Sequence, residues 1–374
     1  MSVKLNDKSF CIFPFVQVVV RTDGSMMPCC MIKGKTNIRD SDLEQYWQSD
    51  ELKKIQNDIL AGVDHIPECK QCYDAELDLG KSMRTTTLLD YKFYNKQHYE
   101  KIFNHYNYLD NVFPTRVEMH VGNTCNLKCI TCRPQDSSSF LAEDSALGIS
   151  NFRQSDYQID DSILTHNLEL IMNHNVEILD LRGGESMLSP KIKKILLDLP
   201  ESKCQRTLRI QTNATMLDDD WKIIFNKFKK IEIMASIDAY GQDNYYIRYP
   251  ADWEVIEKNI DYLQTLPNLK LYINCTISNL NFLLIDKLIE WTKSKKIYFY
   301  YNLLTHPQYY HYTNLPTELF EVAQKKLLNY PEIALNGKPS TQYWKQFCDM
   351  INLRDQYRKS SIFNILPELK KWWL

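Results

Sequence analysis

The hydrophobic and polar positions of the chain change their period along its length, and this change predicts its elements. Between residues 115 and 305, short runs of β-branched and apolar residues alternate with stretches in which apolar residues recur every three or four positions. The first pattern is typical of buried strands and the second of amphipathic helices. The predicted strands are Arg116–Val121, Val176–Arg182, Thr207–Thr212, Ile231–Asp238, Lys270–Ser278 and Lys296–Leu303, and the predicted helices are Lys191–Leu199, Asp218–Phe228, Trp253–Leu266 and Phe282–Lys293.

Six strands that alternate with helices imply parallel pairing with right-handed crossovers. The alternation therefore predicts an α/β fold, either a doubly wound sheet or a partial barrel. In both architectures, ligands bind at the carboxyl ends of the strands. We therefore expect functional side chains just after each predicted strand.

The segments on either side of the α/β region have a different character. Residues 1–84 hold five of the cysteines, residues 85–114 have a polar, tyrosine-rich helical pattern, and residues 306–374 are predicted to be a helical tail. The apolar run Phe10–Val20 contains Pro14 and Gln17 and lacks a signal-peptidase site, so we expect a strand there. Since no stretch approaches the roughly eighteen apolar residues of a membrane span, we expect a cytoplasmic protein whose thiols stay reduced.

Composition narrows the class of protein further. With 45 Lys and Arg against 47 Asp and Glu, the 374-residue chain has a net charge of -2, which argues against a protein that binds nucleic acid mainly through its phosphates. An odd count of 11 cysteines does not suit a disulfide scaffold. Eight of these cysteines fall into two groups, which indicates metal ligation; Cys275 and Cys348 are expected in the core.

The densest chemical signal follows the first strand of the α/β region. Cys125, Cys129 and Cys132 form a C-x3-C-x2-C pattern in the loop 121–132. A [4Fe–4S] cluster normally takes four thiolates, so three ligands on one loop leave one iron open to another chelator. An open position is where a metal site performs chemistry. The three cysteines could also belong to a zinc site that is completed by a histidine or by Cys204, Cys275 or Cys348.

The second strand ends at Gly183, Gly184 and Glu185, which include the only adjacent glycines of the chain. Paired glycines let a ligand approach the backbone closely, and Glu185 adds a carboxylate that suits a cationic amine. A simple turn is the structural alternative.

Polar residues follow the next strands as well. Asn213 follows the third strand, and Ser236 and Asp238 end the fourth, where they could bind a ribose. Arg248 precedes the helix that begins near Trp253, and a guanidinium can bind a carboxylate through two hydrogen bonds. Helix capping and a salt bridge are the structural alternatives.

These motifs, in this order, resemble those of the radical S-adenosylmethionine (SAM) superfamily, whose partial (β/α)6 barrel begins with a strand and a C-x3-C-x2-C loop. Thr131, Ser186 and Ala214 stand where that family usually has an aromatic residue, a proline and a glycine. The resemblance implies that a [4Fe–4S] cluster on Cys125, Cys129 and Cys132 binds SAM. It also implies that SAM is contacted by Gly183, Gly184, Glu185, Asn213, Ser236, Asp238 and Arg248.

The N-terminal cysteines resemble the SPASM/twitch domain, an iron–sulfur domain that usually follows the barrel and here precedes it. Its opening pattern is met by Cys11, twelve residues, Gly24, four residues and Cys29. The resemblance implies one auxiliary [4Fe–4S] cluster with the ligands Cys11, Cys29, Cys69 and Cys72. Cys30 is a possible substitute for one of these ligands. A zinc ribbon is the alternative, because four cysteines suit tetrahedral zinc equally well.

The resemblance also implies a function. An enzyme of this kind reductively cleaves SAM to methionine and a 5′-deoxyadenosyl radical, which abstracts hydrogen from a substrate, and a flavodoxin- or ferredoxin-type donor supplies the electron. Many SPASM/twitch enzymes modify peptides or proteins, so we expect a peptide or protein side chain as substrate. The alternatives are a radical SAM oxidoreductase acting on a sugar, alcohol or nucleoside derivative, and a non-catalytic metal-binding partner.

The expected organisation combines these domains. Residues 1–84 form a SPASM/twitch-like auxiliary iron–sulfur domain, 85–114 a helical connector, 115–305 a radical SAM partial barrel and 306–374 a helical C-terminal tail. The fold class is therefore α/β.

Overall fold

The computed structural model describes residues 10–79, 82–85, 113–330, 333, 335 and 337–374. The chain divides into two compact units. Unit 1 consists of Met1–Gly122, Tyr157–Gly183 and Pro200–Leu208, and unit 2 of Asn123–Asp156, Gly184–Leu199 and Arg209–Leu374. The expected connector, residues 85–114, falls largely outside the described residues.

The described strands of unit 1 lie in the order β3-β2-β1-β4-β5. Strands β1, β2 and β3 pair antiparallel, whereas β4 pairs parallel with both β1 and β5. The strands are β1 (Gln17–Val20), β2 (Ser25–Met27), β3 (Thr36–Asn37), β4 (Arg116–His120) and β5 (Ile178–Arg182). The helices include α1 (Phe13–Val16), α2 (Leu43–Trp47), α3 (Asp50–Leu60), α4 (Lys70–Leu79) and α8 (Asp161–Asn173), with the short 3-10 helices η1 (Pro67–Cys69) and η5 (Glu201–Gln205).

The prediction of one strand over Phe10–Val20 is partly wrong. Only Gln17–Val20 form a strand, and Phe13–Val16 form the helix α1. Pro14 lies in the first turn of α1, where its missing N–H costs nothing, whereas a strand would lose a ladder hydrogen bond there. The valines of β1 are fully buried, as the apolar pattern indicates.

The described strands of unit 2 follow one another in chain order, and β7, β8 and β9 pair parallel. They are β6 (Thr207–Thr212), whose first two residues belong to unit 1, β7 (Lys230–Ser236), β8 (Leu269–Ile277) and β9 (Tyr298–Leu303). The helices include α7 (Ser138–Ala146), α9 (Pro190–Asp198), α10 (Asp219–Lys227), α11 (Gln242–Ile247), α12 (Trp253–Gln264), α13 (Ile285–Ser294), α14 (Thr317–Leu327) and α15 (Trp344–Arg358). Short 3-10 helices are η4 (Ser186–Leu188), η6 (Gln308–Tyr310), η7 (Ile362–Asn364) and η8 (Pro367–Trp372).

The α/β fold class is confirmed. All six predicted strands and four predicted helices are present, with ends shifted by at most three residues. The order of strands and helices along the chain fits the predicted partial (β/α)6 barrel, and the predicted tail contains the helices α14 and α15. Among the described residues, no helix combines the length and the apolar character needed to cross a membrane.

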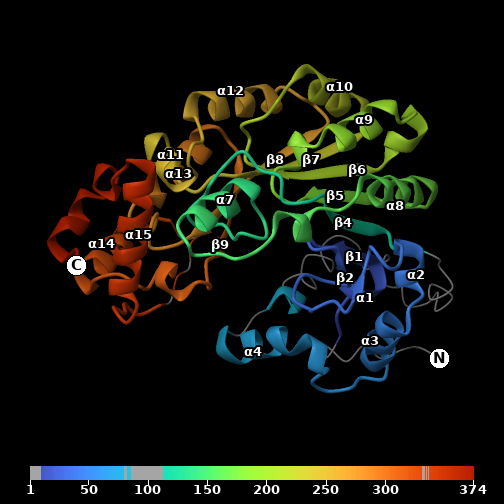
Figure 1. The fold of residues 1–374 in the computed structure, drawn as a ribbon, viewed down its shortest axis with the longest axis horizontal. Coiled ribbons are helices and arrows are strands. Elements are labelled where there is room, and N and C mark those ends of the chain that lie inside the picture. Colours follow the sequence, from blue (N-terminus) through green and yellow to red (C-terminus); the bar gives the residue numbers. More distant parts are fainter. Residues whose placement is uncertain (1–9, 80–81, 86–112, 331–332, 334, 336) are drawn as a thin grey trace. The chain divides into compact units, whose positions relative to one another are not determined.

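Helices α9, α10 and α12 lie along one side of strands β7 and β8 (Figure 1). Asp218 caps the start of α10 by accepting a hydrogen bond from the N–H of Trp221 at 3.0 Å, which satisfies a donor that the helix itself leaves free. The indole of Trp221 is fully buried and donates to the carbonyl of Met187 at 2.9 Å. Trp221 therefore joins α10 to the loop that follows β5.

Trp221→Ala is expected to lower the free energy of unfolding by about 3–5 kcal/mol, because it leaves a cavity and an unpaired carbonyl. Ile223→Ala on the same helix removes a side chain that is 56% exposed and should change stability by only about 0.5 kcal/mol. Chemical denaturation followed by circular dichroism measures both variants. Equal losses would contradict the placement of this face of α10 in the core.

Candidate metal centres

The cysteine loop that follows β4, residues 125–132, is held at its start by hydroxyl groups of α7 in unit 2. Ser137, the N-cap of α7, donates its hydroxyl to the carbonyl of Leu127 at 2.8 Å. Ser139 donates to the carbonyl of Cys125 at 2.6 Å, and the hydroxyl of Ser138 accepts from the N–H of Cys125 at 3.1 Å. The first turn of α7 therefore fixes the backbone around the first cysteine.

The second half of the cysteine loop pairs with the segment that follows α11. The N–H of Lys128 donates to the carbonyl of Tyr249 at 2.6 Å, and the N–H of Ile130 donates to the carbonyl of Ile247 at 2.8 Å. These two hydrogen bonds lie on either side of Arg248, so the same segment carries that arginine past the loop.

The three thiols of the loop lie near one another in a desolvated place. Burial raises the pKa of all three, that of Cys129 to about 11. The pKa of Cys132 is raised further by Cys129 and Cys125, whereas the positive charge of Arg248 lowers that of Cys129. The folded chain alone therefore keeps these thiols protonated, and a bound metal must displace the protons.

The paired glycines allow a close approach of the chain to itself. A Cβ on Gly184 would lie 2.3 Å from the carbonyl oxygen of Thr124, to which the N–H of Glu185 donates at 2.7 Å. Gly183 has a φ of +128°, and a Cβ there would lie 2.4 Å from the carbonyl oxygen of Gly122. The glycines are therefore required because the backbone just before the cysteine loop packs directly against them.

Glu185 is buried, and its carboxylate is already engaged. It accepts hydrogen bonds from the hydroxyl of Thr212 at 2.9 Å and from the N–H groups of Asn213 at 2.7 Å and Met187 at 3.2 Å. Burial raises its pKa, and these bonds oppose the rise. Since a carboxylate offers about four lone pairs, about one remains for an amine. Asn213 in turn donates to the Oδ1 of Asn126 in the cysteine loop at 2.9 Å.

Ala214 adopts a left-handed backbone conformation that glycine adopts more easily. It has a φ of +60°, which costs a residue with a Cβ about 1–2 kcal/mol. The Oδ1 of Asn213 accepts from the N–H of Thr215 at 3.0 Å and from its hydroxyl at 2.6 Å. These local bonds hold the turn without a glycine, but Asn213 does not cap the next helix, because the N-cap of α10 is Asp218.

Asp238 and Arg248 form a buried ion pair. The fully buried carboxylate of Asp238 accepts from Nη1 of Arg248 at 2.9 Å and from the N–H of Thr276 at 2.8 Å. The hydroxyl of Ser236 accepts from Gln211 at 3.4 Å. Two residues that the sequence suggested as separate ligand contacts are therefore joined to each other, with Asp238 holding the guanidinium in place.

The donor set of unit 2 fits an iron–sulfur cluster with an amino-acid ligand. Cysteine sulfurs are soft ligands that suit such clusters. Two buried polar atoms of the predicted SAM-binding segments have no hydrogen-bond partner. They are the Nε of Arg248 and the hydroxyl of Ser186, which follows Glu185. Within the described ranges, no three His, Cys, Asp or Glu side chains are already gathered as a metal site, so the ligand sets stay predictions.

Four cysteines of unit 1 line one pocket. Its other lining residues are mostly apolar, and the full lining is Cys11, Phe13, Pro14, Cys29, Met31, Ile32, Cys69, Cys72, Met83 and Arg84. Burial and the neighbouring thiols raise the pKa of Cys29 to about 12 and that of Cys69 to about 11. The pKa of Cys11 is raised by burial and by all three of the others. These four cysteines therefore line one pocket, although among the described residues their side chains are not yet gathered as a metal site.

Gly24 makes the turn that brings Cys11 and Cys29 to the same pocket. It has a φ of +81° in the hairpin between β1 and β2, and its N–H donates to the carbonyl of Arg21 at 2.9 Å. A Cβ would lie 2.6 Å from the Oδ1 of Asn37. The glycine of the sequence pattern is therefore required by the backbone of the hairpin.

Cys30 does not line the pocket, although it lies beside the pocket residue Met83 and influences the pKa of Cys29. Its Sγ lies 3.2 Å from the Sδ of Met83. Burial and the negative charge of Glu118 raise its pKa, and Arg21 and Arg182 lower it. This charged environment supports the ligand set Cys11, Cys29, Cys69 and Cys72.

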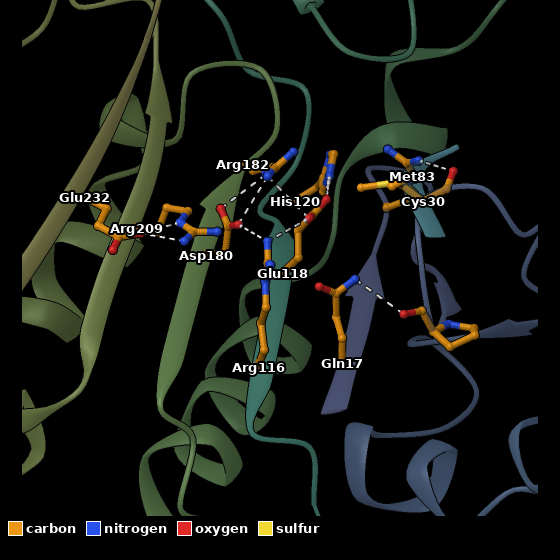
Figure 2. Close-up of polar contacts among 12 residues, drawn as sticks. Gln17, Cys30, Met83, Arg116, Glu118, His120, Asp180, Arg182, Arg209 and Glu232 are labelled. Carbon is orange, nitrogen blue, oxygen red and sulfur yellow. Dashed lines mark hydrogen bonds and ion pairs between the residues drawn. The ribbon is translucent and has the colours of Figure 1, made fainter. Parts of the chain in front are cut away.

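Sequence reasoning missed a row of charged and ionisable residues, partly or fully buried, on one face of the sheet in unit 1 (Figure 2). On β4 these are Arg116, Glu118 and His120, and on β5 they are Asp180 and Arg182. Asp180 accepts from Arg116 at 2.9 Å and from Arg182 at 3.1 Å, and His120 lies 3.1 Å from Glu118. The signal was available, because charged residues at every second position of a strand predict one polar face.

Residues 11–73 match the family model of SPASM, described as an iron–sulfur cluster-binding domain. This match confirms the resemblance of the N-terminal cysteines to the SPASM domain. The chain is also 22% identical over 185 residues to Molybdenum cofactor biosynthesis protein 1 of Dictyostelium discoideum, a match that covers 49% of this chain and 27% of that protein. The chain thus spans about a quarter of the curated relative that it matches.

Solved structures show a distant likeness. SuiB of Streptococcus suis bound to precursor peptide SuiA is 16% identical with a TM-score of 0.42, covering 67% of this chain and 56% of that chain. Native anSMEcpe with bound AdoMet is 17% identical with a TM-score of 0.41, covering 64% and 66%. The radical S-adenosylmethionine methyltransferase TsrM from Kitasatospora setae is 9% identical with a TM-score of 0.36, covering 50% and 36%.

Glu118→Gln is expected to destabilise the metal-free protein at pH 7. Burial alone would raise the pKa of Glu118, but Arg182, His120 and Arg116 lower it from 4.5 to about 2, which corresponds to about 3 kcal/mol. Because the folded protein favours the ionised carboxylate, this stabilisation is fully present above pH 4.5 and is lost as the pH falls toward 2.

Urea denaturation between about pH 6 and pH 3 measures this effect as the slope of unfolding free energy against pH. The slope should be smaller in the variant than in the wild type. Glu177→Gln, at an exposed position just before β5, is the control and should keep the wild-type slope. An unchanged slope in Glu118→Gln would contradict the buried ion pairs.

Cys69→Ala is expected to remove the auxiliary cluster, whereas Cys30→Ala should retain it, because Cys69 lines the cysteine pocket and Cys30 faces charged side chains. Iron and sulfide content after anaerobic reconstitution, with Mössbauer spectra, measures the outcome. Loss of the auxiliary cluster in Cys30→Ala would show that Cys30 is the fourth ligand.

Proposed function

We propose that this chain, a radical SAM protein with an N-terminal SPASM domain, reductively cleaves SAM at a [4Fe–4S] cluster held by Cys125, Cys129 and Cys132. When bound, the cluster and SAM supply a 5′-deoxyadenosyl radical that abstracts hydrogen from a substrate. We propose a peptide or protein side chain as that substrate.

The observation that carries this proposal is the arrangement of the cysteine loop. Its three thiols come from one short segment, influence one another electrostatically and are held by backbone hydrogen bonds on both sides. Three ligands from the protein suit a cluster with one open iron, where a substrate or co-substrate binds.

The neighbouring residues have defined tasks in this proposal. Asp238 fixes Arg248, and Arg248 retains an unpartnered buried Nε, so its guanidinium is available to the carboxylate of SAM. The remaining acceptor capacity of Glu185 serves the amino group of SAM. Asn213 and Ser236, at the ends of β6 and β7, are proposed to lie near the ribose.

The SPASM domain supports the choice of substrate. Many radical SAM enzymes with this domain modify peptides or proteins, and an auxiliary cluster in the cysteine pocket of unit 1 could accept an electron or bind a peptide group. A flavodoxin- or ferredoxin-type protein is the proposed electron donor. The protein's own contribution is to orient the reactants and exclude water.

The test is release of 5′-deoxyadenosine from SAM by anaerobically reconstituted, dithionite-reduced protein. The wild type should release it, and Cys129→Ala should release none, because the SAM-binding cluster loses a ligand. Cys204→Ala, a buried cysteine outside both predicted ligand sets, is the matched control and should behave as the wild type. Equal release by Cys129→Ala, or zinc in place of iron, would contradict the proposal.

Isotope transfer tests the substrate class separately. A short open reading frame beside the gene would supply a peptide to assay. With deuterium on its side chains, that peptide should pass label into 5′-deoxyadenosine. Label that comes only from a small molecule would favour the oxidoreductase alternative.

A further inference from the structure

Two arginines of α15 join the C-terminal part of unit 2 to α7 through buried carboxylates. Nη1 of Arg354 lies 2.7 Å from Glu143, and its Nη2 lies 2.6 Å from Asp144. Nε and Nη2 of Arg358 lie 3.0 and 2.8 Å from oxygens of Glu143. All four side chains are at most 5% exposed. Two positive and two negative charges therefore neutralise one another away from water. The contribution of such buried ion pairs to stability depends strongly on their geometry.

Arg358 also contacts the cysteine loop itself. Its Nη2 donates to the carbonyl of Lys128 at 2.5 Å, and its guanidinium lies 5.0 Å from the ring centre of Tyr249. Lys128 immediately precedes Cys129 and donates its N–H to the carbonyl of Tyr249. One side chain of the tail therefore touches both the loop and the segment that pairs with it.

One donor of Arg358 has no hydrogen-bond partner. Its Nη1 is buried and unsatisfied, a state that normally costs about 1–3 kcal/mol. Nη2 of the same guanidinium donates to the carbonyl of Lys128, the residue before Cys129, so the unpaired donor lies beside the cysteine loop. A thiolate ligand or a cluster sulfide is the kind of acceptor that such a donor suits.

Arg354 is the matched arginine at this junction, and its Nε is likewise buried without a hydrogen-bond partner. It is as deeply buried as Arg358 and binds the same Glu143. Its guanidinium lies over the ring of Phe140 at 4.5 Å, and it also interacts with Tyr310. These contacts involve α7 and η6, whereas Arg358 adds the contact with the cysteine loop.

We propose that Arg358 is a positioning residue of the SAM-cluster site: anchored by Glu143, it holds the Lys128 carbonyl and thereby orients Cys129 for cluster binding. This inference rests on the proposed function of the loop. It makes the C-terminal tail part of that site, a role that neither the cysteine motif nor the SPASM match assigns.

The test compares Arg358→Met with Arg354→Met, which removes an equally buried arginine that also binds Glu143. In metal-free protein, amide hydrogen exchange across residues 125–132 should be faster in Arg358→Met and unchanged in Arg354→Met. After reconstitution, an iron chelator should remove the cluster whose EPR signal responds to SAM about 10–100-fold faster from Arg358→Met than from the wild type. Arg358→Lys, which keeps a donor and the charge, should lie in between.

Equal effects of the two methionine variants would overturn the proposal, because both arginines would then only join α15 to α7. Wild-type loop exchange and cluster retention in Arg358→Met would overturn it as well. If Arg358→Met does not fold, Arg358→Lys against Arg354→Lys decides by the same measurements. The wild type could bind no SAM-responsive cluster while amide hydrogen exchange in its cysteine loop still depends on Arg358. That result would contradict the proposed function and support the positioning role.

Discussion

The hydrogen bonds that fix the backbone of the cysteine loop are the constraint on which the site in unit 2 depends. A short segment that carries three thiols has no core of its own, so its orientation must come from its neighbours. Hydroxyls of α7 hold Cys125 and Leu127, and the segment after α11 holds Lys128 and Ile130. Since buried backbone groups are costly to leave unpaired, this arrangement is specific to one loop conformation.

Two arginine side chains lie beside the hydrogen bonds that hold the cysteine loop. Arg248, paired with Asp238, and Arg358, paired with Glu143, both lower the pKa of Cys129 against the effect of burial. Each cation is neutralised by a carboxylate that also fixes its position, which limits the cost of burying it. The same contacts therefore hold the loop and offset part of the effect by which burial disfavours the Cys129 thiolate.

The ligand-binding roles that the sequence motifs suggest agree only in part with the contacts that these residues make in the structure. Gly184 is needed because the carbonyl of Thr124 lies where a Cβ would be, and Glu185 accepts three hydrogen bonds from the chain itself. Ala214 adopts the left-handed conformation that glycine would adopt more easily. A motif thus identifies the right place in the fold, while the role of each side chain follows from contacts that spacing cannot reveal.

Periodicity and spacing by themselves determined the α/β class, the strands of the α/β region and the two groups of cysteines, because burial and metal ligation impose local patterns. The sequence also carried the charged alternation of β4, which went unnoticed. Only the tertiary structure decided that Pro14 starts a helix and that Asp238 binds Arg248. It also decided that four cysteines line one pocket whose lining does not include Cys30. Arg358 and Glu143 are 215 positions apart, and no local pattern records such a contact, because it arises only when the chain has folded.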